Sequence, residues 1–146
     1  MLEQRGFPYD KLCIVQAESV GTITASAAGL ATTGGSAAYF DTGGGYTKGQ
    51  WIVDAHFVGS SASQAAMRLR LQGSTTTTFS TYVNLAAFDL GYLTRTLNNV
   101  AKLSGRYHFP FHNDFGGIMY RYLRVYMTKL GTLATGIDYA SFLSIE

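Results

Sequence analysis

Apolar and polar residues alternate at every second position in several short segments of this chain. A period of two places successive side chains on opposite faces of a strand, so one face can pack in a core while the other meets solvent. The segments that we expect to form strands are residues 11–17, 36–41, 51–58, 66–72, 106–111, 120–127 and 137–145. Stretches rich in Gly, Ser and Thr separate many of them, which is typical of turns between strands.

The alternation also predicts which side chains share a face of each strand. In residues 51–58 we expect Trp51, Val53, Ala55 and Phe57 on one face, and Ile52, Asp54, His56 and Val58 on the other. In residues 66–72 the inward side chains are Met67, Leu69 and Leu71, and the outward ones are Arg68 and Arg70. In residues 120–127 the more apolar face holds Arg121, Leu123, Val125 and Met127, and the other holds Tyr120, Tyr122, Arg124 and Tyr126.

Three segments are less regular. Residues 19–33 show no clear period, and a helix over residues 25–31 is possible although Gly29 disfavours it. Residues 79–90 fit no single pattern. Residues 93–103 fit a short helix or a strand–turn–strand, of which we favour the second. Pro110 has no N–H to donate, so we expect residues 106–111 to form an edge strand or to end there.

Together these segments predict an all-β chain. We expect one antiparallel β-sandwich or jelly roll of about eight strands over residues 1–146. Residues 1–10, which are polar and contain Pro8, are expected to form an extended N-terminal arm.

The composition changes this picture in one respect. Charged residues make up only 14% of the chain, against about 25% in ordinary soluble domains, while Tyr and Phe number 10 and 9. Such a chain can expose aromatic surface to a partner. The net charge of +2 is scattered, which disfavours specific nucleic-acid binding and membrane-surface binding. No signal peptide or apolar run of about 18 residues is present, so we expect a cytoplasmic site of synthesis.

No set of residues predicts catalysis, a cofactor or a metal site. Asp54 and His56 share a strand face, but no G-x-S-x-G motif supplies a nucleophile, so an exposed polar pair is the favoured interpretation. His108 and His112 would lie roughly 13 Å apart in a strand, too far for one zinc ion. The glycine-rich residues 43–49 lack the phosphate-binding order G-x-x-x-x-G-K-[ST]. The lone Cys13 is expected to be a buried thiol that forms no disulfide within the chain.

The remaining aromatic and basic residues fit a role in protein–protein contacts better than a role in catalysis or metal binding. Tyr and Arg are enriched at protein interfaces because they combine large area with a polar end. Exposed arms and loops can also add contacts to a neighbouring subunit. The candidate interface residues are Pro8, Tyr9, Tyr46, Lys48, Tyr120, Tyr122, Arg124 and Tyr126.

The C-terminal third also carries a resemblance to a known family. The run from Arg121 to Thr128 (RYLRVYMT), followed by Leu130-Gly131-Thr132 and by residues 135–140, resembles the R-Y-L-R-(L/V)-x-Y…G-T…G-x-(V/I)-x-A pattern of capsid cement proteins of tailed phages. The Thr/Ala-rich residues 20–28 and the run LRLQ at residues 69–72 are similar to that family too. The chain departs from the pattern at Met127, where an aromatic residue is expected, and at Lys129, where an apolar residue is expected.

The resemblance implies a jelly-roll virion protein without enzyme activity. Such a protein forms a homodimer or homotrimer, lies on the outside of the phage head and stabilises contacts between major capsid subunits. Two other hypotheses remain open. The first is a carbohydrate- or receptor-binding sandwich that uses exposed rings such as Trp51, Tyr82 or Tyr107. The second, which we favour least, is a small hydrolase built on Asp54 and His56.

Overall fold

Strands make up most of the part of the chain that the structure describes. A computed structural model describes residues 13–17, 20–30, 37–59, 66–91, 104–130 and 136–146. Within these residues there is no α-helix. The first strands are β1 (Ile14–Gln16), β2 (Thr22–Ile23), β3 (Ala27–Ala28), β4 (Phe40–Asp41), β5 (Lys48–Gly59) and β6 (Ala66–Ser74). The others are β7 (Val83–Gly91), β8 (Gly105–His112), β9 (Asp114–Phe115), β10 (Ile118–Met119), β11 (Tyr122–Leu130) and β12 (Gly136–Ile145).

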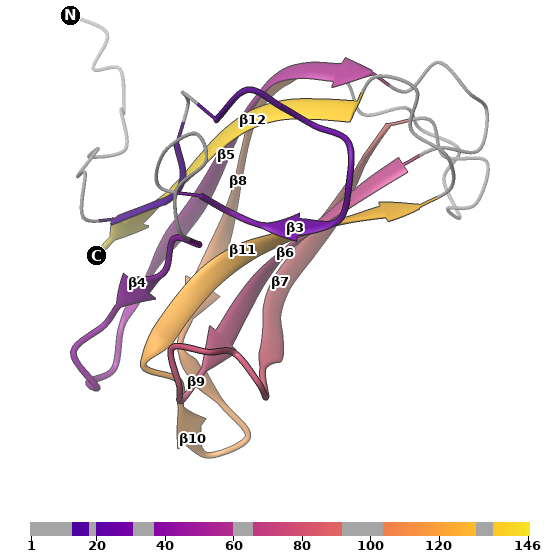
Figure 1. Ribbon diagram of the computed structural model, residues 1–146. Coiled ribbons are helices and arrows are strands. Elements are labelled where there is room, and N and C mark those ends of the chain that lie inside the picture. The colour runs from indigo at the N-terminus through magenta and orange to yellow at the C-terminus, as the bar shows by residue number, and fades with distance from the viewer. Residues whose placement is uncertain (1–12, 18–19, 31–36, 60–65, 92–103, 131–135) are drawn as a thin grey trace, which may run out of the picture.

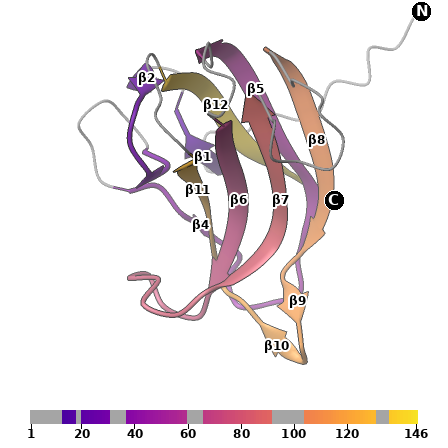
Figure 2. The ribbon, with the colours of Figure 1, turned by 90° about the vertical axis from the view of Figure 1, so that its right-hand side faces the viewer.

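These strands form two antiparallel sheets and one short hairpin. The first sheet, called here the β5 sheet, has the order β1-β12-β5-β8, with β2 also paired to β12. The second, the β6 sheet, has the order β3-β11-β6-β7, with β4 also paired to β11. Figures 1 and 2 show the two sheets facing each other, with the β9–β10 hairpin beyond their lower end.

The strand order is that of a jelly roll. Because β1 and β2 both pair with β12, they occupy one strand position, and β3 and β4 together occupy the next beside β11. The eight positions are then divided between the two sheets in the orders 1-8-3-6 and 2-7-4-5, which is the strand order of a jelly roll. The expected all-β sandwich is therefore confirmed. The twelve described strands exceed the expected eight because two positions are split and the β9–β10 hairpin is added.

The core between the sheets comes from the predicted alternation. The fully buried inward side chains include Trp51 and Val53 of β5, Met67, Leu69 and Leu71 of β6, Leu123, Val125 and Met127 of β11, and Ile137, Tyr139 and Leu143 of β12. Arg68 and Arg70 point away from this core, as expected. Pro110 is exposed on β8, which lies at the edge of the β5 sheet, so the expected edge strand is confirmed.

Several expectations about individual elements were wrong. Ile52 was expected on a solvent face, but it is fully buried although it lies on the opposite side of β5 from Trp51. For residues 25–31 the sequence favours no single structure; the described residues 25–30 contain strand β3 and no helix. Arg121 is exposed and precedes β11, so it does not belong to the apolar face of that strand. The arm at residues 1–10 and the segment 93–103 lie outside the described residues.

Candidate functional site

The Asp54–His56 pair lies on the outer face of β5, where Asp54 has a different partner. Both carboxylate oxygens of Asp54 accept hydrogen bonds from Arg106 of β8, at 2.6 Å from Nε and 2.8 Å from Nη2. These bonds raise the pKa of the Arg106 guanidinium. His56 is exposed. Both oxygens of the Asp54 carboxylate, which a catalytic pair with His56 would need, are therefore bonded to Arg106.

The histidines of β8 lie in extended backbone on either side of Pro110. His108 and His112 are both exposed. Among the described residues, no three His, Cys, Asp or Glu side chains lie close enough together to hold a metal ion. Cys13 is buried, as expected.

The candidate interface residues of β11 share one surface on the outer side of the β6 sheet. Tyr122, Arg124 and Tyr126 alternate with the buried Leu123, Val125 and Met127. The antiparallel register places Arg124 opposite Gln72 of β6 and Tyr126 opposite Arg70. Tyr82, from the loop before β7, lies within reach of Arg124. We call this surface the arginine–tyrosine face; it comprises Arg70, Gln72, Tyr82, Tyr122, Arg124 and Tyr126.

Arg124 is at the centre of this face, surrounded by aromatic rings. Its guanidinium carbon lies 4.3 Å from the ring centroid of Phe79, 5.1 Å from that of Tyr126 and 5.8 Å from that of Tyr82. Its Nε donates a hydrogen bond to Oε1 of Gln72 at 2.9 Å. Burial against these rings lowers the pKa of the guanidinium, because the charged form loses hydration.

The ring beneath Arg124 is held by an unusual backbone conformation. Phe79 has a φ of 51° and is the one non-glycine residue with positive φ in the described part of the chain. This conformation costs a bulky residue on the order of 1–3 kcal/mol and persists only where its surroundings enforce it. In the same loop, the hydroxyl of Ser74 donates to the carbonyl of Thr81 at 2.7 Å and accepts from the N–H of Thr76 at 3.2 Å. The loop between β6 and β7 thus places the buried Phe79 ring against Arg124.

A second exposed surface is the hairpin formed by β9 and β10. Its two-residue turn is Gly116-Gly117, and both glycines have positive φ, as a tight hairpin turn with right-handed twist requires. Three large apolar side chains are exposed on it: Phe115 at 55%, Ile118 at 50% and Met119 at 49%. Phe115 and Ile118 are opposite each other and share one side of the hairpin. Figures 1 and 2 show the hairpin projecting away from both sheets.

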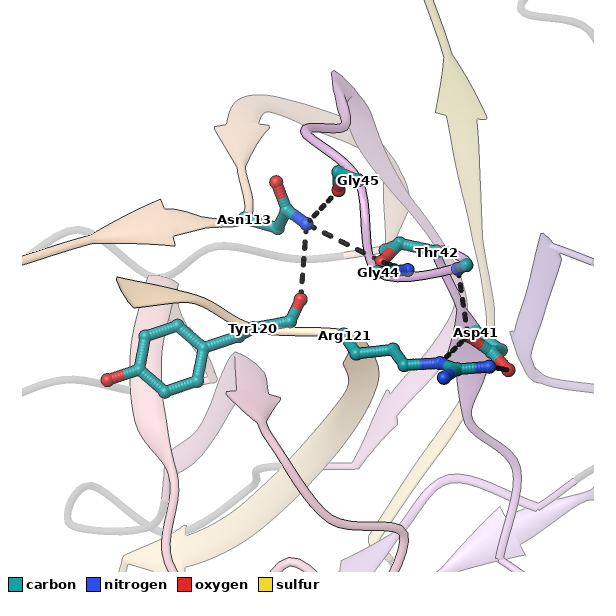
Figure 3. Close-up of polar contacts among 8 residues, drawn as sticks. Asp41, Thr42, Gly44, Gly45, Asn113, Tyr120 and Arg121 are labelled. Atoms are coloured by element: carbon teal, nitrogen blue, oxygen red, sulfur yellow. Dashed lines mark hydrogen bonds and ion pairs between the residues drawn. The ribbon is translucent and has the colours of Figure 1, made fainter. Parts of the chain in front are cut away.

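Asn113 ties this hairpin to the glycine-rich loop before β5. Its buried Nδ2 donates to the carbonyls of Gly45 at 2.9 Å and Tyr120 at 3.2 Å, and its Oδ1 accepts from the N–H of Thr47 at 2.8 Å. Figure 3 shows the amide pointing into the space between the two segments. The base of the hairpin is therefore held by a specific polar network, and its apolar end is presented in a defined direction.

An ion pair beside this network holds the glycine-rich loop from the other side. The Asp41 carboxylate accepts from Arg121 at 2.8 and 3.1 Å and from the N–H of Gly43 at 2.8 Å (Figure 3). The hydrogen bond from Arg121 is the main cause that lowers the pKa of Asp41.

Three other candidate interface residues, Tyr46, Lys48 and Tyr120, do not join the arginine–tyrosine face. Tyr46 and Lys48 line a surface hollow of about 380 Å³ beside the end of β8, together with Pro110, His112 and Glu146. Lys48 lies 3.8 Å from Glu146 there, an exposed ion pair. Tyr120 precedes β11, and its backbone bonds to Asn113. Pro8 and Tyr9 lie outside the described residues.

Sequence reasoning missed several residues that build these surfaces. The sequence F-G-G-I at residues 115–118 carried a usable signal, since two glycines between apolar residues favour a tight hairpin. No local pattern indicates the role of Asn113, because its partners are separated from it by up to 71 residues. The same holds for Phe79 and Tyr82, because they lie more than 40 residues from Arg124 in the sequence and reach it only through the pairing of β6 with β11.

Comparison with known proteins does not assign a family. A scan against protein-family models and a search of curated proteins both find no match to this chain. Among the described residues, no helix has the length and apolar character needed to cross a membrane.

Proposed function

We propose that this chain is a structural protein of a tailed-phage head: a capsid cement protein that binds the outer surface of the shell and stabilises contacts between major capsid subunits. The observation that carries the proposal is the apolar end of the β9–β10 hairpin. Phe115, Ile118 and Met119 are each about half exposed on a projecting element. Exposed apolar surface of this kind marks a site of protein–protein contact.

A protein that joins neighbouring subunits needs more than one contact surface. The chain offers two on different elements, the β9–β10 hairpin and the arginine–tyrosine face on β6 and β11. Many copies on a regular lattice bind with avidity, so each contact can be modest. Self-association as a dimer or trimer, and a location on the virion exterior, belong to the same proposal. The resemblance of residues 121–140 to phage cement proteins supports it.

The alternative of a sugar-binding module has less support. Trp51, one of its three candidate rings, is fully buried in the core and cannot stack on a ligand. Tyr107 is half-buried, and Tyr82 is 49% exposed. A glycan array that returned specific hits abolished by Tyr82→Ala would favour this alternative.

Co-sedimentation with expanded phage heads that lack the protein tests the proposal. We expect saturable binding of the wild type. The triple variant F115S/I118S/M119S is expected to bind about 100-fold more weakly. Burial of such a side chain contributes about 1.5–3 kcal/mol, and about half of each remains to be buried here.

The matched control keeps the hairpin apolar. The variant F115L/I118L/M119L retains apolar area at all three positions and is expected to bind within about threefold of the wild type, since only shape changes. Failure of the wild type to bind heads would contradict the proposed function. Equal binding of the serine variant would show that the hairpin is not the contact.

A further inference from the structure

Arginines on the outer surfaces of this sandwich fall into two groups. Arg68, Arg106 and Arg121 each form a two-bond pair with an aspartate, through Nε and Nη2 in every case. Arg70 and Arg124 are different. Among the residues that the structure describes, neither has a carboxylate within ion-pair distance.

The two arginines without carboxylate partners are neighbours on one surface. Arg124 is opposite Gln72, and Arg70 is opposite Tyr126, so they occupy diagonal positions on adjacent strands. Diagonal positions in an antiparallel pair are about 7–8 Å apart. The aspartates that share the outer side of the β6 sheet, Asp89 and Asp41, are already paired with Arg68 and Arg121. No carboxylate of a described residue therefore compensates the two positive charges at the centre of the arginine–tyrosine face.

The contacts of these arginines are neutral. Arg70 donates from Nη1 to the hydroxyl of Thr128 at 3.2 Å, and Arg124 donates from Nε to Gln72 at 2.9 Å. Aromatic rings attract the Arg124 guanidinium through their faces, but they do not neutralise it. Within the described part of the chain, these guanidinium groups keep N–H donors that no protein group accepts. Such donors can bind an anion, and the two oxygens of a carboxylate match the planar geometry of a guanidinium.

The surroundings favour a polypeptide as the source of that carboxylate. The surface is the outer face of a sheet, with Tyr39 and Tyr82 exposed at 44% and 49% on its margin and Tyr39 packed edge-on against Tyr122 at 5.5 Å. Tyrosine and arginine around a polar centre are the composition typical of protein interfaces. The loop conformation at Phe79 supports Arg124 before any partner binds.

We infer that the arginine–tyrosine face binds an acidic polypeptide segment of the partner, whose Asp or Glu carboxylates pair with Arg70 and Arg124. This inference rests on the proposed function in one point only, namely that the partner is a protein of the capsid. Its chemistry follows from the charges and contacts of this face. On a phage head, the surface that meets it would be acidic.

The test measures binding of labelled poly-L-glutamate by fluorescence anisotropy. We expect the wild type to bind it and to lose affinity as salt is raised, because the contacts are charged. The double variant R70Q/R124Q is expected to bind at least about tenfold more weakly, since two charge-assisted contacts are lost. The variant R106Q/K129Q removes the same net charge elsewhere and is expected to change affinity by less than about threefold.

Several results would overturn the inference. These are no binding of poly-L-glutamate by the wild type, equal loss in the two double variants, or tighter binding of alginate or oligothymidylate than of poly-L-glutamate. Thermal melts of each variant confirm that the fold is kept. The head assay is read separately: a wild type that binds poly-L-glutamate through Arg70 and Arg124 but does not bind heads contradicts the proposed function and leaves this inference standing.

Discussion

Trp51→Ala is expected to lower the free energy of unfolding by about 3–5 kcal/mol, the range for removing a large buried aromatic side chain. Trp51 is fully buried, and its ring lies 5.4 Å from that of Phe88 and 5.7 Å from that of Phe109, measured between centroids. Its Nε1 donates to the hydroxyl of Ser141 at 2.8 Å. The substitution leaves a cavity between the sheets and removes this hydrogen bond.

Urea denaturation followed by circular dichroism measures this effect. In a separate thermal melt, Trp51→Ala should lower the melting temperature by about 6–20 °C for a chain of this size. Trp51→Phe is the matched variant. It keeps most of the ring volume, and the Ser141 hydroxyl still donates to the carbonyl of Ile52 at 3.0 Å, so its loss should be clearly smaller. A loss below about 1 kcal/mol for Trp51→Ala would mean that the ring does not fill the core.

Asn113→Ala is expected to destabilise the protein by about 2–4 kcal/mol and to release the base of the β9–β10 hairpin. The substitution removes the partners of the Thr47 N–H and of the Gly45 and Tyr120 carbonyls. A buried polar group left without a partner costs about 1–3 kcal/mol, and water can reach part of this site because Gly45 is exposed. Hydrogen exchange should show faster exchange at residues 42–47 and 114–119.

Two further variants sharpen this result. Asn113→Asp places a carboxylate oxygen against the two carbonyls that now accept from Nδ2, so at neutral pH it should be at least as destabilising as alanine. Asn84→Ala is the control, because this exposed amide makes only a 3.5 Å contact with Gln72, and the change should stay within about 0.5 kcal/mol. Unchanged exchange in the hairpin of Asn113→Ala would show that other contacts hold it.

The sandwich could be predicted from sequence where one face of a strand is apolar and the other polar. Met67, Leu69 and Leu71 alternate with two arginines, and the structure buries the three apolar side chains. The rule fails at Ile52, because the opposite side of β5 is also covered at that position. Alternation of apolar and polar residues predicts which side chains share a face of a strand. It does not predict whether other parts of the chain cover that face.

The candidate site was predictable only in part for a related reason. The outward positions of Tyr122, Arg124 and Tyr126 follow from alternation within one strand. The contacts that make Arg124 distinctive come from Gln72 on the neighbouring strand and from Phe79 and Tyr82 in a separate loop. Strand register and a left-handed backbone at a phenylalanine are set by the whole fold, and neither leaves a local signal in the sequence.

The central claim is that bound copies of this protein reinforce a phage shell, and the heat stability of expanded heads tests it most directly. DNA release from heads lacking the protein is followed by dye fluorescence as temperature rises, with and without added protein. Our account predicts a higher release temperature that stops increasing once all sites are filled, and no increase with F115S/I118S/M119S. The same release temperature for bare heads and for heads saturated with the wild type would contradict it.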